Sequence, residues 1–143
     1  MHDALPVDSC PFDWSAEYRV ADATRRARAG QLRPAQWHLE HAALTVEQAL
    51  VRLNSPPPVA RLVVCHGDAC APNTLLDDDG QPSGHVDLGS LGLADQWADL
   101  AVATRSTEWN YGPRWTDILL DAYGVGRDDH RINYYRLLWD LGP

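Results

Sequence analysis

The most informative stretch of the chain is the polar run His66-Gly67-Asp68-Ala69-Cys70-Ala71-Pro72-Asn73. A second short piece, Val86-Asp87-Leu88-Gly89, follows a few residues later. Together they supply a carboxylate, an amide and a second carboxylate at Asp68, Asn73 and Asp87. A positioned carboxylate can accept a proton from a hydroxyl, and carboxylate and amide oxygens are ligands that Mg²⁺ accepts. The two pieces predict acid–base chemistry beside a bound metal ion.

The spacing of these residues follows a catalytic pattern. The order H-G-D-x-x-x-x-N, then D-x-G, has the spacing of a kinase catalytic loop and its metal site. In phosphoryl transfer the first Asp orients the attacking hydroxyl, while the Asn and the second Asp hold Mg²⁺ against the phosphates. We therefore predict Asp68 as the catalytic base and Asn73 and Asp87 as the metal ligands.

A hairpin signal brings the metal ligands together. Thr74-Leu75-Leu76 and Gly84-His85-Val86 flank an acidic turn that contains Gly and Pro, a pattern typical of two short paired strands. Antiparallel pairing would place Asn73, at the start of one strand, beside Asp87, at the end of the other. Both side chains could then reach one metal.

The remainder of the chain predicts mostly helix. Leu62–Cys65 is a short apolar run and indicates a buried strand that leads into the polar loop. Asp95 is expected to cap a helix with Leu93 on its apolar face. Periodicity and capping residues predict helices over 16–29, 35–53, 96–107, from Pro113 to Gly124, and after Asp128 or Asp129. We expect an α+β fold, mainly helical, with a small β-hairpin that carries the metal site.

Length, charge and cysteine content limit the classes of protein to consider. A chain of 143 residues suits a single domain over 1–143. A formal net charge of -8 argues against nucleic acid or an anionic membrane as a partner and suits a cationic small molecule. Three cysteines without a dense framework, and no signal peptide, predict a cytoplasmic protein with reduced thiols.

Phosphate-binding elements are missing from the sequence. All twelve basic residues are arginine, and neither G-x-G-x-x-G nor G-x-x-x-x-G-K-[ST] occurs. Kinase-like enzymes hold ATP with a strand lysine and a Gly-rich loop. The sequence therefore predicts the half of a phosphotransferase that holds the metal and the acceptor.

The chain resembles the C-terminal lobe of the aminoglycoside phosphotransferases, in particular the aminoglycoside 3′-phosphotransferase-like enzymes, over essentially its whole length. The resemblance implies transfer of the γ-phosphate of ATP to a hydroxyl of an aminoglycoside or related molecule, with ATP and Mg²⁺ as cofactors. It also implies that the nucleotide-binding N-terminal lobe is absent, so the chain reads as truncated. Besides the two motifs, the matching stretches are 5–7, 10–12, 63–65, 91–92, 94–95, 98–101, 103–105 and 135–138.

The resemblance also implies roles for single residues. Asp68 would be the base, His66 would brace the catalytic loop, and Asp99 would support that loop through its backbone amides. Ser90 departs from the family, in which arginine usually follows the D-x-G piece. The acidic tail that holds the acceptor's amines in these enzymes is reduced to Asp140.

Several readings stay open on the sequence alone. Glu40, Glu108 and Asp140 could face a cationic acceptor or could be ordinary surface charges. A zinc site from Cys65, His66 and Cys70 is a poorer interpretation, because the spacing is not C-x-x-C. Exposure of the face that would lie beneath ATP predicts a homodimer, or pairing with a missing N-terminal lobe.

Two other functions compete with the transferase. A non-catalytic remnant or binding module would explain the absence of lysine. A metal-dependent hydrolase would use His66, Asp68 and Asp87 and would turn over without nucleotide. Transfer of phosphate from ATP to an acceptor would indicate the transferase, and turnover without nucleotide would indicate the hydrolase.

Overall fold

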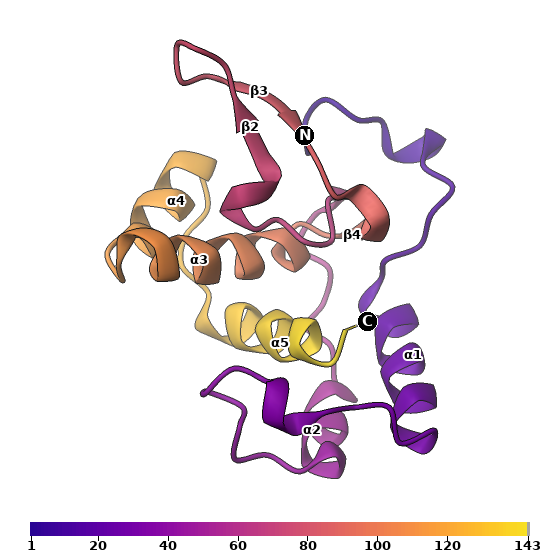
Figure 1. Ribbon diagram of the computed structural model, residues 1–143. Helices are drawn as coiled ribbons and strands as arrows, with labels where there is room; N and C mark the ends of the chain where they lie inside the picture. The colour runs from indigo at the N-terminus through magenta and orange to yellow at the C-terminus, as the bar shows by residue number, and fades with distance from the viewer. Residues whose placement is uncertain (143) are drawn as a thin grey trace.

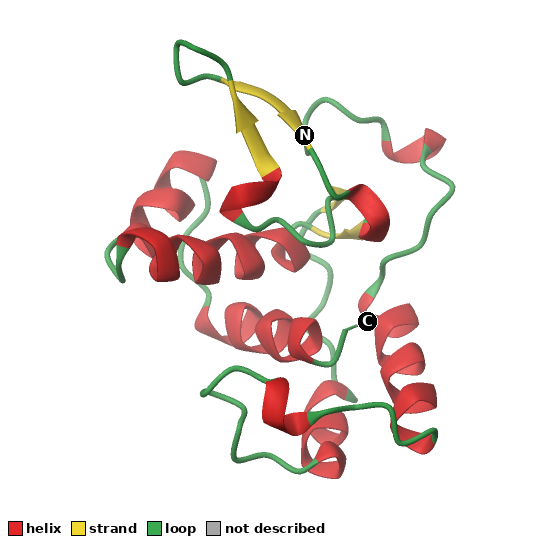
Figure 2. Cartoon of the chain, in the orientation of Figure 1, coloured by secondary structure: helices red, strands yellow, loops and turns green. Residues whose placement is uncertain are grey.

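Five α-helices and two small antiparallel sheets form residues 1–142, the part of the chain that the computed structural model describes (Figure 1). The mainly helical α+β class predicted from the sequence is confirmed, as Figure 2 shows. The helices are α1 (Ala16–Arg28), α2 (Val46–Leu53), α3 (Trp97–Tyr111), α4 (Trp115–Tyr123) and α5 (Asp129–Asp140). The strands are β1 (Leu62–Cys65), β2 (Thr74–Leu76), β3 (Pro82–His85) and β4 (Gly92–Asp95).

Helix α5 lies at the centre of the helical part and packs against α1, α2 and α3 (Figure 1). A helix with buried residues at consecutive positions must have neighbours on most of its sides. This holds for α5, whose buried residues are Ile132, Tyr134, Tyr135, Arg136, Leu137 and Leu138.

Among the described helices, α5 included, none has both the length and the apolar composition needed to cross a bilayer.

Side chains that satisfy free backbone groups set the helix ends. The Ser15 hydroxyl accepts the Tyr18 N–H at the start of α1, and the Asp128 carboxylate accepts the Arg131 N–H at the start of α5. Gly124, with a φ of +90°, ends α4 in the left-handed conformation that glycine favours. The capping residues therefore fix these boundaries close to where the sequence predicts them.

Strand β4 pairs with β1 and is an element that the sequence analysis missed. Leu93, expected on the face of the following helix, lies in this strand opposite Val64. The N-terminal segment joins the same sheet, because the Leu93 N–H donates to the Phe12 carbonyl at 2.8 Å and its carbonyl accepts the Trp14 N–H at 3.0 Å. A Cβ on Gly92 would lie 2.9 Å from Trp14 Cβ, so glycine permits this close approach.

The predicted hairpin is confirmed. Strand β2 pairs with β3, with Thr74 opposite His85, and the hairpin projects from the helical body (Figure 2). The Asp77 carboxylate closes the turn by accepting the Asp79 and Gln81 N–H groups at 3.1 and 2.8 Å. Local turn chemistry is thus sufficient to explain why this segment reverses.

The helix predicted over Ala35–Leu53 is wrong in its first half. Helix α2 begins after Thr45, whose hydroxyl takes part in a capping box. Leu39, expected on the apolar face, is 87% exposed. The segment before Thr45 is held instead by a tertiary contact between the His41 ring and the Asp140 carboxylate at the end of α5. The spacing of apolar residues does not predict this contact, which holds the segment before Thr45 in a non-helical conformation.

Candidate active site

The polar loop leaves the buried strand β1 and turns at Gly67. This residue has a φ of +85°, in the region that favours glycine. A Cβ here would lie 2.2 Å from the backbone oxygen of Ser90. Only glycine therefore lets the turn before Asp68 lie against the segment that follows Asp87.

The carboxylate of Asp99, in the first turn of α3, holds the backbone of this loop. Its Oδ2 accepts the His66 N–H at 2.7 Å, and its Oδ1 accepts the Gly67 N–H at 2.8 Å. The same Oδ2 lies 2.9 Å from Nε2 of His2, and the carboxylate is only 6% exposed. A buried carboxylate that accepts several N–H groups fixes their positions firmly. Asp99 thus holds the two backbone N–H groups that immediately precede Asp68 in the chain.

Both oxygens of the Asp68 carboxylate accept hydrogen bonds. The Cys70 thiol donates to Oδ1 at 3.1 Å, and the Asn73 amide donates to Oδ2 at 3.1 Å. Burial, and then the hydrogen bond to Asp68, raise the pKa of Cys70 to about 12. The thiol therefore remains a donor at neutral pH. No sequence pattern predicts this contact of Cys70 with Asp68.

The hairpin brings Asn73 and Asp87 to the same end. The Val86 N–H donates to the Asn73 carbonyl at 3.0 Å, one residue before Asp87. Asp87 has a φ of +60°, and no other non-glycine residue within 1–142 has a positive φ. Such a conformation costs free energy and is concentrated at functional sites. The strained backbone turns the chain away from β3 where the exposed Asp87 begins the next segment.

The side-chain oxygen atoms of Asn73 and Asp87 are suitable ligands for a hard cation. The Asn73 amide nitrogen is used on Asp68, while within residues 1–142 no hydrogen bond engages its amide oxygen or the Asp87 carboxylate. Carboxylate and amide oxygens are suitable ligands for Mg²⁺. The chemistry of the donor set thus agrees with the metal that the motif predicts.

His66 connects the two sides of the site and is 2% exposed. Its Nδ1 accepts the Asp68 N–H at 3.3 Å, and its Nε2 lies 2.9 Å from the Val86 carbonyl. A neutral ring protonated on Nε2 satisfies both contacts. With both nitrogens in use, the ring links the loop of Asp68 to the segment of Asp87.

A cavity of about 390 Å³ opens beside Asp68. Gly67, Asp68 and Ser90 form part of its wall, with Trp139 and Asp140 from the end of α5. The cavity is large enough for part of a small molecule. Of the predicted acceptor ligands, Asp140 lines this cavity, whereas Glu40 lines another, of about 440 Å³.

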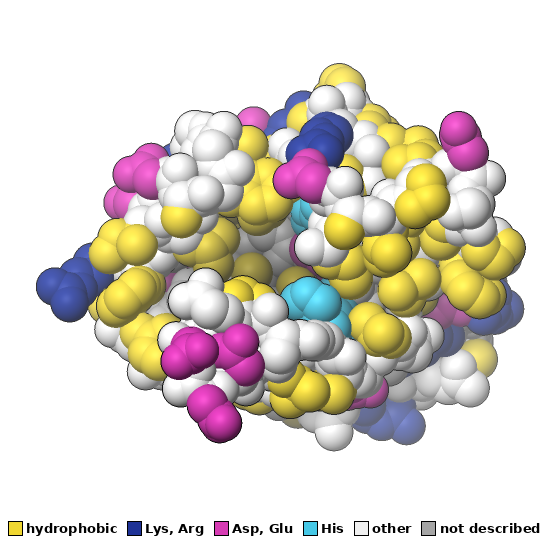
Figure 3. Space-filling view, turned by 90° about the horizontal axis from the view of Figure 1, so that it is seen from above, with side chains coloured by type: hydrophobic (Ala, Val, Ile, Leu, Met, Phe, Trp, Pro, Cys, Tyr) yellow, Lys and Arg dark blue, Asp and Glu magenta, His cyan; other side chains and the backbone are white. Residues whose placement is uncertain are grey.

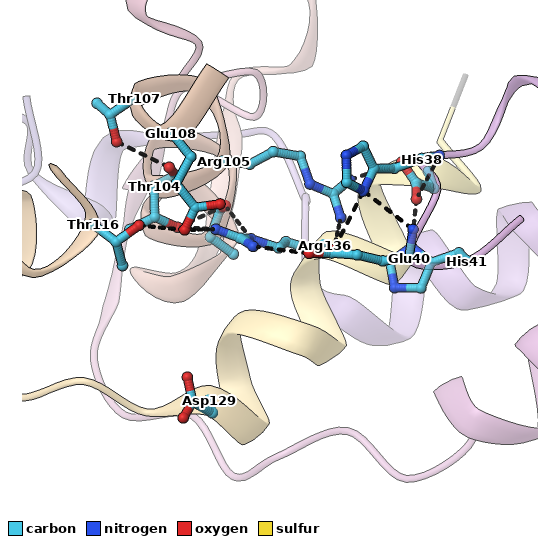
Figure 4. A network of polar contacts seen from close by, with 12 residues as sticks. His38, Glu40, His41, Thr104, Arg105, Thr107, Glu108, Thr116, Asp129 and Arg136 are labelled. Atoms are coloured by element: carbon cyan, nitrogen blue, oxygen red, sulfur yellow. Dashed lines mark hydrogen bonds and ion pairs between the residues drawn. The ribbon is translucent and has the colours of Figure 1, made fainter. Parts of the chain in front are cut away.

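The acidic side chains predicted to meet the acceptor are held in a network of ion pairs (Figure 4). Asp140 pairs with Arg105 at 2.9 Å and with His41. Glu40 pairs with the same Arg105 at 2.8 Å. Burial opposes the effect, but Arg105 and Arg136 lower the pKa of Glu40 overall. Glu108 also pairs with Arg136, at 3.2 Å. These acids are therefore largely neutralised before any acceptor binds.

The zinc interpretation of Cys65, His66 and Cys70 finds no common centre. The Cys65 thiol donates to the Asp95 carbonyl at 3.4 Å, away from Cys70, which donates to Asp68. A second grouping, of His2, Cys65 and Asp99, has its polar atoms within 4.8 Å of one another. Burial raises the pKa of Cys65 well above its ordinary value, so its thiol stays protonated, and the Asp99 oxygens already accept N–H groups. Hydrogen bonding explains this grouping without a metal.

Comparison with known proteins identifies the family and the fold of the chain. Residues 1–135 match the family model described as the phosphotransferase enzyme family. The chain is 38% identical over 142 residues to an aminoglycoside 3′-phosphotransferase of Streptomyces fradiae, covering 94% of this chain and 53% of the relative. It is 35% identical to a streptomycin 3″-kinase of Streptomyces griseus, covering 92% and 53%.

Solved structures give the same result. An aminoglycoside 3′-phosphotransferase of type VIII superposes with a TM-score of 0.85 at 30% identity, covering 96% of this chain and 55% of that one. An aminoglycoside phosphotransferase from Streptomyces rimosus, in complex with ADP and streptomycin, superposes with a TM-score of 0.81 at 30% identity, covering 98% and 57%.

The fold and the H-G-D-x-x-x-x-N loop define a kinase-like phosphotransferase domain. The chain belongs to the phosphotransferase enzyme family that includes the aminoglycoside phosphotransferases. It spans about half the length of the relatives that it matches.

Proposed function

We propose that the chain carries the acceptor and metal half of a phosphotransferase that moves the γ-phosphate of ATP to a hydroxyl of an aminoglycoside or related small molecule. One observation carries the proposal. The side-chain amide of Asn73 donates to the Asp68 carboxylate, and the backbone carbonyl of Asn73 accepts the N–H of Val86, the residue before Asp87. Hydrogen bonds therefore join Asp68 to Asn73, and Asn73 to the segment that carries Asp87.

In this proposal Asp68 acts on the acceptor. Its carboxylate orients the hydroxyl, whose oxygen forms a bond to the γ-phosphorus while the bond from that phosphorus to the leaving ADP oxygen breaks. The hydroxyl proton passes to Asp68. The hydrogen bonds from Cys70 and Asn73 fix the plane of the carboxylate before the acceptor arrives. Since the transition state is loose, positioning contributes more than basicity.

Asn73 and Asp87 would hold Mg²⁺ through the oxygen atoms that hydrogen bonds leave free. The ion, when bound, neutralises charge on the transferred phosphoryl group. His66 and Asp99 would contribute indirectly, because both hold the backbone of the loop rather than face the cavity. We therefore assign them to positioning and Asp68 to the chemistry.

The identity of the nucleotide and acceptor is part of the proposal. The matched Streptomyces rimosus structure holds ADP and streptomycin, which supports a nucleotide and an aminoglycoside as ligands. The cationic character of the acceptor rests on the net charge of -8 and stays a prediction. The cytoplasmic location and the single-domain boundary of 1–143 also stay predictions.

Self-association is the assembly we expect of the chain by itself. Hydrophobic side chains are spread over the face seen from above the hairpin (Figure 3). In and next to the hairpin, Leu75, Leu76, Val86 and Leu88 are each at least 40% exposed. Exposed apolar surface of this kind favours association with another protein surface.

A non-catalytic binding module is the second candidate, because the chain has no lysine to hold nucleotide phosphates. The deciding experiment measures Mg²⁺-dependent transfer of labelled γ-phosphate from ATP to a panel of aminoglycosides, with release of free phosphate followed in parallel. Acceptor-dependent transfer supports the phosphotransferase. Aminoglycoside binding without transfer supports the binding module. Hydrolysis of a phosphate ester with no nucleotide present would instead support a hydrolase.

A further inference from the structure

Arg19 of α1 is a buried charge without an acidic partner. The residue is 5% exposed, and no hydrogen bond or ion pair within residues 1–142 engages its guanidinium group. Its nearest compensation is the ring of Trp14, whose centroid lies 5.0 Å from Arg19 Cζ. A cation–π contact offsets only a small part of the cost of burying a charge. Arg19 is therefore poised for an anion that residues 1–142 do not supply.

A second unsatisfied donor lies beside it. The indole Nε1 of Trp14 is buried and has no hydrogen-bond partner in the described chain. Trp14 is firmly placed, because its backbone N–H donates to Leu93 of β4 at 3.0 Å. Buried donors without partners are rare in native proteins, and two neighbouring ones indicate a ligand or ordered water.

Both side chains line the 390 Å³ cavity that contains Asp68. Within residues 1–142, neither of the two arginines on its wall is paired with either of the two acids there. Arg26 lines it too and donates to the Leu141 carbonyl rather than to an acid. Asp140 is the other acid on the wall besides Asp68, and it is already paired with Arg105. Burial lowers the pKa of Arg19 to about 10, so Arg19 stays charged at neutral pH.

We infer that Arg19 and the Trp14 indole N–H form an anion subsite in this cavity, which takes a phosphate-class oxyanion. The guanidinium would donate to the phosphate oxygens and the indole N–H to one of them. A phosphate group offers the several acceptor atoms that these donors need, in a cavity wide enough to admit it.

This inference rests on the proposed function for its biological ligand. After transfer, the phosphate resides on the acceptor in the cavity that Asp68 lines, and Arg19 would hold it there. Free inorganic phosphate carries the same chemistry and is the other source. If Arg19 serves only to pack on Trp14 and water fills the cavity, phosphate should not bind there.

The test uses isothermal titration calorimetry of the 143-residue chain with inorganic phosphate, with chloride at equal ionic strength as the reference. We expect saturable phosphate binding that Arg19→Met weakens about 10- to 100-fold, because a charged hydrogen-bond donor is lost. Arg19→Lys should retain part of the affinity. Arg28→Met, an exposed position on the same helix, is the matched control and should bind like the wild type.

A spectroscopic measurement on the unsubstituted protein makes the result independent of folding in the variants. Addition of phosphate should shift the indole N–H proton resonance of Trp14, identified by its loss in Trp14→Phe. In phosphate-free buffer Arg19→Met should melt no lower than the wild type, since an unpaired buried charge is removed. A lower melting temperature in Arg19→Met, with no indole shift and no phosphate binding, would overturn the inference in favour of the packing role.

The outcome is separable from that of the proposed function. Phosphate binding that depends on Arg19, in a chain that shows no transfer, would keep the subsite and reject the transferase. Transfer that is insensitive to Arg19→Met, with no binding of phosphate or of the phosphorylated acceptor, would reject the subsite and keep the transferase. A phosphorylated acceptor that binds more tightly than inorganic phosphate would identify the product as the ligand.

Discussion

Cys70 donates a hydrogen bond to Asp68 Oδ1, and its protonation state decides whether that hydrogen bond can form. With a pKa of about 12, the thiol donates throughout the neutral range and cannot take the proton of the acceptor. The hydrogen bond from Cys70 instead restrains the carboxylate that would take it. A protonated thiol two residues from the proposed catalytic base would therefore serve positioning, without nucleophilic chemistry of its own.

Substitution of Asp68 should release the Cys70 thiol. In Asp68→Asn the negative charge that helps raise the Cys70 pKa is gone, while burial remains. We expect alkylation of Cys70 by iodoacetamide at pH 9 to become several-fold faster, measured by mass spectrometry with the partly buried Cys10 as the internal reference. An unchanged ratio of Cys70 to Cys10 labelling would show that the carboxylate does not control the thiol.

Individual site residues could be predicted where a motif names them, and not where tertiary contact creates them. Asp68, Asn73 and Asp87 follow from spacing alone. Cys70 and Arg19 do not, because their importance depends on which neighbours satisfy them and which do not. The pairing of Asp140 with Arg105 likewise joins residues from two different helices, a contact without a local signal.

Among the secondary-structure elements, β4 connects the site to the helical core through Asp95. Its Oδ1 accepts the Trp97 N–H at 2.9 Å, at the start of α3. Its Oδ2 accepts the Ala60 N–H at 2.6 Å, before β1, and Arg131 of α5 at 3.1 Å. One buried carboxylate thus joins four segments, which extends the capping role that the sequence suggested for it.

Loss of that carboxylate should destabilise the fold. Asp95→Asn removes the charge facing Arg131 and leaves buried N–H donors poorly satisfied, so the free energy of unfolding should fall by about 3 kcal/mol. Urea unfolding measures it. Asp129→Asn, at a side chain 68% exposed, is the control and should change stability by less than about 0.5 kcal/mol. Equal effects of the two substitutions would refute the linking role of Asp95.

Prediction of elements succeeded where the signal is local. Caps and turn residues around α1, α4, α5 and the hairpin act within a few positions, so they can be read from the sequence. Strand β4 was missed because Gly92–Asp95 is neither a continuous apolar run, as β1 is, nor next to a turn signal, as the hairpin strands are, and it pairs with β1 at separations of 27 to 33 residues. The false helix before Thr45 had suitable spacing, but contact with α5 determines its conformation.

At the scale of the whole molecule, several acidic protons are retained by burial. Burial raises the pKa of Tyr134 to about 12, and it raises the pKa of Cys65 and Tyr135 as well. The folded state then holds protons that the unfolded chain releases near pH 8.5 to 10, roughly their ordinary pKa values. Stability from these groups is complete below that range and is lost as the pH rises through it toward the folded values.

The free energy of unfolding should therefore decline from about pH 9 to about pH 10.5. Urea denaturation at pH 7, 9 and 10.5 measures the decline. Burial also raises the pKa of Cys70, so Cys70→Ser removes a further group of this kind and should make the decline less steep. A stability that stays constant to pH 10.5 would contradict the retention of these protons in the folded state.

The central claim is that Asp68 acts directly on the acceptor hydroxyl. Its most direct test compares the rate of γ-phosphate transfer by the wild type, by Asp68→Asn, and by Asp78→Asn in the exposed hairpin turn. We expect Asp68→Asn to lower the rate by about 10²- to 10⁴-fold with an unchanged circular dichroism spectrum, and Asp78→Asn to leave the rate unaltered. Transfer by folded Asp68→Asn at the wild-type rate would contradict the assignment.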